Sequence, residues 1–150
     1  MRYFLRYFAF MLAMMGVITA VSAQDAIPDL KGSWSGKGKS IVFGNNPHHP
    51  GSHTVASPPR VREFEFTFVV DGQDGRLVWG HSFSTVAGTN ETFAWAISAD
   101  NKSIFGADTD GYYQMTVMSP DRIEMCYAHN GLSPSGSIVA TCYVMERTKK

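Results

Sequence analysis

The side chains of this sequence that could do chemistry are mainly histidines and tyrosines. His81 stands in an apolar stretch, where an imidazole that titrates near neutral pH could be a general base, a ligand donor or a haem ligand. Tyr113, Tyr127 and Tyr143 carry hydroxyl groups that donate or accept hydrogen bonds. Together these groups suggest acid–base chemistry of the isomerase or cyclase kind. The alternative interpretation of His81 is a hydrogen-bonded histidine in the core.

A second histidine group has the spacing of a metal site. His48, His49 and His53 could bind Zn²⁺ or Cu²⁺ through their imidazoles. The surrounding segment, residues 46–53, contains no carboxylate or thiol and is rich in Pro. We therefore interpret it as a solvent-exposed loop, and we predict neither a metal nor a cofactor.

The remaining motifs do not match known catalytic or calcium-binding loops. Asp108-Thr109-Asp110-Gly111 resembles part of a calcium loop, but Gly106 stands at the other acidic position and the distal Glu is missing, so a turn is predicted. The sequence has no G-x-S-x-G, Walker or H-E-x-x-H motif. These observations favour a binding protein over an enzyme.

Residues 1–23 have the three parts of a secretory signal peptide. Arg2 and Arg6 give a positive start, residues 7–20 form an uncharged run, and residues 21–23 place small side chains before the cleavage site. The run is shorter than the about 20 apolar residues of a membrane span. We expect a mature chain, residues 24–150, that is exported to the periplasm or the cell exterior and is not inserted in the membrane.

The expected mature chain has a nearly balanced charge. Removing Arg2 and Arg6 from 13 basic residues leaves 11 against 13 acidic residues, a net charge of −2. This balance gives no electrostatic basis for binding nucleic acid or an anionic membrane surface. The length is that of a single domain.

Apolar residues of the mature chain alternate with polar ones, as in half-buried strands, and no helical pattern is present. Eight such segments are separated by clusters of Gly, Asp, Asn and Pro. They are residues 32–43, 63–70, 77–84, 92–97, 103–108, 113–117, 122–128 and 139–145. Eight consecutive antiparallel strands with one apolar face favour a closed up-and-down barrel, an all-β fold without open edges, over a two-sheet sandwich.

Alternation also predicts how two of the hairpins pair. If residues 71–75 form a turn, Phe68 lies opposite Trp79 and Phe66 lies opposite His81, with all four side chains inside.

In the last hairpin, placing Cys126 opposite Cys142 puts Arg122 opposite Glu146 outside and apolar pairs inside. This agreement, together with the even cysteine count, predicts a disulfide between Cys126 and Cys142.

The predicted interior is rich in aromatic and methionine side chains, with a few polar groups among them. Small-molecule sites have this composition. An eight-stranded barrel is wide enough to be filled by side chains or to hold one small ligand, so plain filling is the alternative. We predict that a small hydrophobic or aromatic molecule binds inside. The predicted ligand-binding residues are Trp34, Phe66, Phe68, Trp79, His81, Phe83, Trp95, Tyr113, Met125, Tyr127 and Tyr143.

The start of the first segment resembles a family motif. Gly32-Ser33-Trp34 is similar to the G-x-W of the lipocalins and their calycin relatives, which include the avidins. The resemblance implies an eight-stranded barrel over nearly the whole mature chain. It also implies that Trp34 closes one barrel end with Arg147 packed over it, and that residues 45–60 form a lid. The other lipocalin signatures and the biotin ligands of avidin have no counterpart here, so no family ligand is carried over.

Two alternatives to a ligand-binding barrel stay open. In the first, the cavity is the active site of an enzyme that uses His81 and the inner tyrosines, which requires His81 to point inward. In the second, an outer face binds another protein or a second copy of this chain, giving a homo-oligomer. The apolar residues predicted to face outward are Ile41, Phe43, Val69 and Val78.

Overall fold

The computed structural model describes residues 26–45, 51–85, 89–130 and 136–149. The predicted signal peptide at residues 1–23 lies outside the described residues, as do His48 and His49. His53 is described and is exposed in the segment that precedes the second strand.

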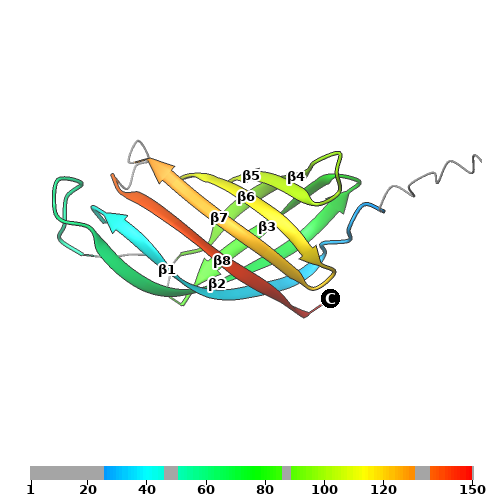
Figure 1. The fold of residues 1–150 in the computed structure, drawn as a ribbon, viewed down its shortest axis with the longest axis horizontal. Coiled ribbons are helices and arrows are strands. Elements are labelled where there is room, and N and C mark those ends of the chain that lie inside the picture. Colours follow the sequence, from blue (N-terminus) through cyan, green and yellow to red (C-terminus); the bar gives the residue numbers. More distant parts are fainter. Residues whose placement is uncertain (1–25, 46–50, 86–88, 131–135, 150) are drawn as a thin grey trace, which may run out of the picture.

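Eight antiparallel strands close into one barrel, in which each strand pairs with the next and the last pairs with the first (Figure 1). The strands are β1 (Gly32–Phe43), β2 (Arg60–Asp74), β3 (Leu77–Ser84), β4 (Glu91–Ile97), β5 (Ser103–Ala107), β6 (Tyr112–Ser119), β7 (Arg122–Asn130) and β8 (Ile138–Lys149). The predicted all-β up-and-down barrel is confirmed. Within the described ranges, the chain has no helix of the length and apolar character needed to cross a membrane.

One end of the barrel is closed by Trp34 at the start of β1. The Trp34 side chain is fully buried, and its Nε1 donates a hydrogen bond to the carbonyl oxygen of Leu30 at 2.8 Å. The guanidinium of Arg147 on β8 lies over the indole, with Cζ 4.1 Å from the ring centroid. Arg147 also pairs with Asp121 at 3.0 Å and donates to the carbonyl oxygen of Asp29. The Trp–Arg closure implied by the calycin resemblance is therefore present.

Gly36 lets β1 approach the interior side chains of β8. A Cβ on Gly36 would lie 2.6 Å from the carbonyl oxygen of Val144 and 2.7 Å from Cδ2 of Tyr143. Both distances are too short for non-bonded atoms, so a larger residue here would displace the Tyr143 ring. The absence of a side chain at Gly36 therefore leaves the space that the Tyr143 ring occupies in the interior.

The predicted register of the β2–β3 hairpin is wrong. β2 continues through residues 71–74 and the turn is confined to residues 75–76, so Val70 pairs with Gly80 rather than with Leu77. The pairing also shifts at a bulge just after Val70. Because the true register differs from the predicted one by an odd number of residues, the side chains of β3 change faces. The predicted interior residues that point outward instead are Trp79, His81 and Phe83.

The inner face of β3 carries small side chains, at Val78, Gly80 and Ser82. They leave room for large rings from the next strand, since a Cβ on Gly80 would lie 2.8 Å from Cζ of Phe93. Phe93 and Trp95 on β4 stack on each other with their ring centroids 4.1 Å apart. The aromatic bulk of this part of the core therefore comes from β4.

The last hairpin has the predicted register. Cys126 on β7 lies opposite Cys142 on β8, and the two form a disulfide. Arg122 lies opposite Glu146, with Arg122 Nε and Glu146 Oε1 3.8 Å apart. The predicted disulfide is confirmed, and such a bridge is typical of proteins in oxidising compartments.

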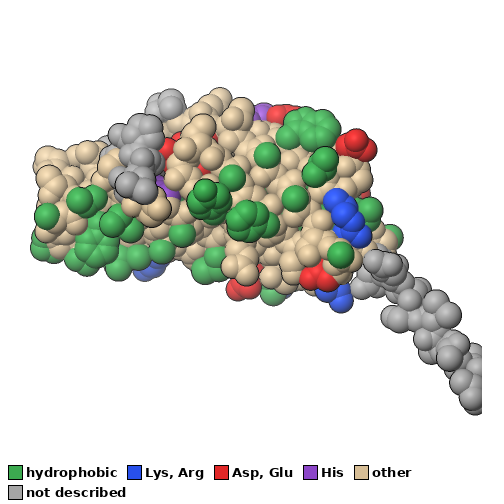
Figure 2. All heavy atoms as spheres, turned by 90° about the horizontal axis from the view of Figure 1, so that it is seen from above, with side chains coloured by type: hydrophobic (Ala, Val, Ile, Leu, Met, Phe, Trp, Pro, Cys, Tyr) green, Lys and Arg blue, Asp and Glu red, His purple; other side chains and the backbone are tan. Residues whose placement is uncertain are grey.

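Apolar side chains also gather on the outside of the barrel. Figure 2 looks onto the face over β4, β5 and β6, where hydrophobic side chains are spread between charged ones at the margins. The large hydrophobic side chains exposed on β3, β5 and β6 are those of Leu77, Trp79, Phe83, Phe105, Tyr112 and Met118. Of the residues predicted to face outward, Ile41 is exposed, but Val78 is only 2% exposed and belongs to the core.

Candidate functional site

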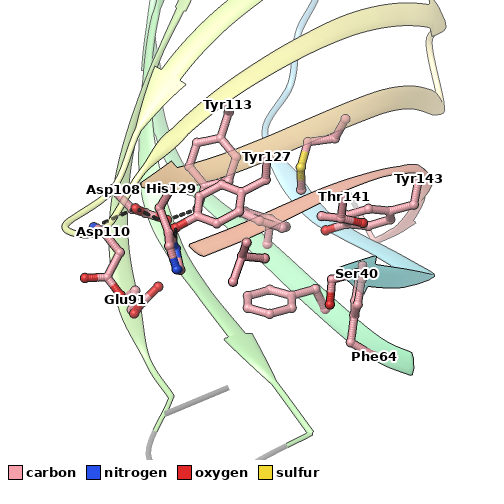
Figure 3. A pocket seen from close by; sticks show the side chains of 14 residues that line it. Ser40, Phe64, Glu91, Asp108, Asp110, Tyr113, Tyr127, His129, Thr141 and Tyr143 are labelled. Carbon is pink, nitrogen blue, oxygen red and sulfur yellow. Dashed lines mark hydrogen bonds between the residues drawn. The ribbon is translucent and has the colours of Figure 1, made fainter. Parts of the chain in front are cut away.

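The barrel is hollowed at the end opposite Trp34, where β1 and β7 finish and β4 and β8 begin (Figure 3). About 50 Å³ of this cavity is open to the centres of water molecules, which is room for a few of them. The residues that line it are Ser40, Phe64, Phe66, Phe68, Glu91, Asp108, Asp110, Tyr113, Met125, Tyr127, His129, Val139, Thr141 and Tyr143.

Phe and Tyr rings contribute six of the fourteen residues that line the cavity. The rings of Phe64 and Tyr143 meet edge to face with centroids 4.9 Å apart, and those of Tyr113 and Tyr127 lie at the same centroid distance. Phe68 is buried beneath them, where its ring contacts Tyr113 edge to face at 5.7 Å. Aromatic pairs in these geometries hold one another in place. These ring contacts give the cavity a packed apolar wall.

Asp108 organises the polar side of the cavity from the turn between β5 and β6. Its Oδ1 accepts hydrogen bonds from the backbone N–H groups of Asp110 at 2.9 Å and Gly111 at 2.7 Å, as aspartates do in turns. The hydroxyl of Tyr113 donates to Oδ2, and the hydroxyl of Tyr127 lies 3.4 Å from Oδ1. One carboxylate thus fixes the turn and both tyrosine hydroxyls.

His129 extends this network along β7. Its Nδ1 lies 3.1 Å from the Tyr127 hydroxyl, and its Nε2 lies 2.6 Å from the hydroxyl of Ser137. The contacts to Ser137, Tyr127 and Asp108 can all be made when neutral His129 carries its proton on Nδ1. Ser137 then donates to Nε2, Nδ1–H donates to Tyr127, and Tyr127 donates to Asp108. These contacts connect Ser137, His129 and Tyr127 to the carboxylate of Asp108.

Burial raises the pKa of the three inner tyrosines above the ordinary value. The pKa of Tyr143 is raised by burial alone. Those of Tyr113 and Tyr127 are raised first by burial and then by the negative charge of Asp108. All three hydroxyls therefore stay protonated at neutral pH.

We predict that these tyrosines resist ionisation until the barrel unfolds. An unfolded tyrosine ionises near pH 10, and the folded pKa values lie higher, so their contribution to stability is complete below about pH 10 and is lost as the pH rises through the folded values. Absorbance of tyrosinate during an alkaline titration should show a late step that coincides with unfolding by circular dichroism. In Tyr143→Phe this step should be smaller. Ionisation of every tyrosine near pH 10 in a still folded protein would contradict this.

The structure brings together only part of the predicted ligand-binding set. The members that line the cavity are Phe66, Phe68, Tyr113, Met125, Tyr127 and Tyr143. Trp34 and Trp95 are buried in the core but do not line the cavity.

Trp79, His81 and Phe83 are outside the barrel, so their prediction as inner residues is wrong. His81 Nδ1 lies 2.9 Å from Asp71 Oδ2, and its ring stacks on Phe83. The hypothesis of an enzyme with His81 as its base required an inward histidine, and this finding overturns it.

The cavity contains a different histidine, His129, which lies just beyond the predicted segment of residues 122–128. β7 runs to Asn130, and His129 continues the inner row of Ile123, Met125 and Tyr127. Extending the alternation by one step would have placed His129 inside. No such pattern places Asp108 at the cavity, because the residues of a turn do not alternate between two faces.

The described residues contain no group of three or more His, Cys, Asp or Glu side chains placed to hold a metal ion. The carboxylates at the cavity therefore do not surround one point as the ligands of a metal ion would.

Comparison with known proteins identifies no family for this chain. No protein-family model matches it, and no curated protein matches it. Among solved structures, it is similar to an S-type phycobiliprotein lyase, CPES, from Guillardia theta, with 13% sequence identity and a TM-score of 0.35. The similarity covers 81% of this chain and 89% of the lyase chain. What the site binds is therefore inferred from this chain's own residues.

Proposed function

We propose that this protein is an exported binding protein that holds a small hydrophobic or aromatic molecule in the open end of its barrel. The observation that carries the proposal is the asymmetry of the interior. Trp34 and Arg147 seal one end, whereas the other end contains a cavity with aromatic walls and one polar side. A mostly apolar hollow with a few fixed polar groups is the usual form of a small-molecule site.

The dimensions of the cavity favour a compact ligand. The open volume of about 50 Å³ is several times the 10–15 Å³ that one water requires, but it is too small to enclose a long acyl chain. Phe64 and Phe66 at the mouth are only partly buried, so a flat molecule would cover apolar surface that now meets water. Met125 adds a side chain that adapts its shape to different partners. A ligand of one or two rings would therefore enter the cavity only in part and lie against the aromatic rings at its mouth.

Export is supported by two features of the chain. The sequence of residues 1–23 has the pattern of a cleavable signal, and the Cys126–Cys142 disulfide suits an oxidising compartment. A protein of this kind would meet its ligand in the periplasm or outside the cell.

The proposal is tested with tryptophol, a neutral two-ring probe, by isothermal titration calorimetry. Val139 is buried and lines the cavity, so Val139→Phe places a ring in the space that the probe needs. We expect tryptophol to bind the native protein and Val139→Phe to weaken it at least tenfold, about 1.4 kcal/mol. The matched control is Val144→Phe on the same strand, where the side chain faces away from the cavity.

Two outcomes would contradict the proposal. One is the absence of any binding heat with the native protein up to the solubility of the probe. The other is equal affinity in the native protein and in a Val139→Phe variant whose circular dichroism shows it to be folded.

A further inference from the structure

We propose that the ligand of this cavity is cationic: an aromatic molecule with an ammonium group, whose ring lies against the aromatic wall and whose charge lies at the acidic side. This inference rests on the proposed function and specifies the chemical class of the ligand.

The cavity is polarised from one side to the other. Figure 3 shows Glu91, Asp108 and Asp110 together on one side, and Phe64 with Tyr143 on the opposite side. All three carboxylate residues line the cavity, and within the described part of the chain its lining includes no lysine or arginine. Against three carboxylates, the described lining could therefore carry a positive charge only on His129.

The three carboxylates lie on the same side of the cavity (Figure 3). Burial first, and then the negative charges of Asp108, Glu91 and Asp110, raise the pKa of Tyr127, as expected when the three carboxylates lie on its side of the cavity. Because the interior has a lower effective dielectric than water, the fields of these charges are weakly screened there. An anionic ligand would be repelled on this side, whereas a cation would be attracted.

The hydrogen-bonding pattern favours a donor over an acceptor. Tyr113 donates its hydroxyl proton to Asp108, and in the network described above Tyr127 does the same, so the remaining capacity of both hydroxyls is to accept. An ammonium group consists only of donors. A ligand carboxylate in the same place would meet acceptors.

An organic cation fits this arrangement better than a metal ion. The described residues place no three metal-binding side chains around one point, so the negative charge is spread along the wall. Aromatic faces beside the carboxylates attract cations through their ring quadrupoles, and ammonium ligands are recognised in this way. The rings of Tyr127 and Tyr113, 4.9 Å apart, provide such faces next to Asp108.

The test compares three indole probes that differ in charge: tryptamine, tryptophol and indole-3-acetate. Calorimetric titration of the native protein should give a dissociation constant for tryptamine at least tenfold below that of indole-3-acetate and also below that of tryptophol. Raising the salt concentration should reduce the advantage of tryptamine.

A charge-neutral variant locates the effect. Glu91→Gln/Asp110→Asn keeps the shape of both side chains and leaves Asp108 to hold the tyrosines. We expect the ratio of the tryptophol to the tryptamine dissociation constant to fall at least tenfold in this variant. Glu124→Gln, which removes an exposed carboxylate from the outer face of β7, is the matched control and should leave the ratio unchanged.

The outcomes separate this inference from the proposed function. If tryptophol binds but tryptamine binds no tighter, or if indole-3-acetate binds best, the cationic ligand is wrong and the binding barrel stands. An unchanged ratio in Glu91→Gln/Asp110→Asn would also overturn the inference. If none of the three probes binds, the proposed function itself fails.

Discussion

Trp34→Ala should be among the most damaging single substitutions in this barrel, lowering the free energy of unfolding by about 3–5 kcal/mol. Trp34 is 0% exposed, and its removal leaves a cavity at the closed end. It also removes the hydrogen bond to Leu30 and the ring on which Arg147 packs. Since small domains have only about 5–15 kcal/mol of stability in total, the loss should be obvious. Urea unfolding followed by far-ultraviolet circular dichroism measures it.

Trp79→Ala provides the matched control for Trp34→Ala. Trp79 is 48% exposed on the outer face of β3, so its removal should cost about 1 kcal/mol or less. Equal losses for the two tryptophans would contradict the assignment of one to the closed end and the other to the surface.

Removing the disulfide should cost nearly as much as removing Trp34. Cys126 and Cys142 are 16 residues apart in the sequence. A disulfide that closes a loop of this length lowers the entropy of the unfolded chain and thereby stabilises the folded state by about 3 kcal/mol. We expect Cys126→Ala/Cys142→Ala to lower the free energy of unfolding by about this amount. Reduction of the native protein with dithiothreitol should have the same effect in the same urea experiment.

Arg122→Ala tests whether the effect belongs to the disulfide or to the hairpin in general. Arg122 pairs with Glu146 in the same two strands, but both side chains are exposed and 3.8 Å apart, so the loss should be below about 0.5 kcal/mol. A urea midpoint that does not change on reduction, or two titratable thiols in the native protein, would contradict the prediction.

The strands and the barrel follow from the sequence because every strand has one buried face. Buried residues stand at every second position, as Phe68 and Val70 do on β2 and Met125 does on the inner row of β7. Side chains of a strand point alternately to its two faces, so burial of one face produces this period of two. Trp34 and Arg147 were located through the calycin resemblance, which a short motif at the right place was enough to provide. The disulfide followed because one register satisfied both charge pairing and burial in the last hairpin.

The error at β3 shows where alternation stops being informative. Leu77, Trp79, His81 and Phe83 alternate as an inner face should, yet they face outward. The bulge after Val70 and the continuation of β2 toward Asp74 change the register, and neither leaves a periodic trace in the sequence. Hydrophobicity alone therefore indicates the wrong face of β3. The inner side chains of β3 must be small, because Phe93 and Trp95 of β4 fill the neighbouring space.

The hydrogen bonds on the polar side of the cavity could not be predicted, because they join residues of a turn and of a strand end. Asp108 reaches Tyr113 and Tyr127 through the geometry of the β5–β6 turn. His129 reaches Ser137 across the end of β7. Contacts between such positions depend on how the barrel closes, and only the closed structure shows them.

The most direct test of the binding cavity is to locate tryptophol by nuclear Overhauser effects to methionine methyl groups. Met125 is buried in the cavity wall, whereas Met118 is 54% exposed on the outside of β6. A ligand in the cavity should show effects to the Met125 methyl and none to that of Met118. Effects to Met118 alone, with the Met125 methyl unperturbed at saturation, would place the molecule on the surface and contradict an internal binding site.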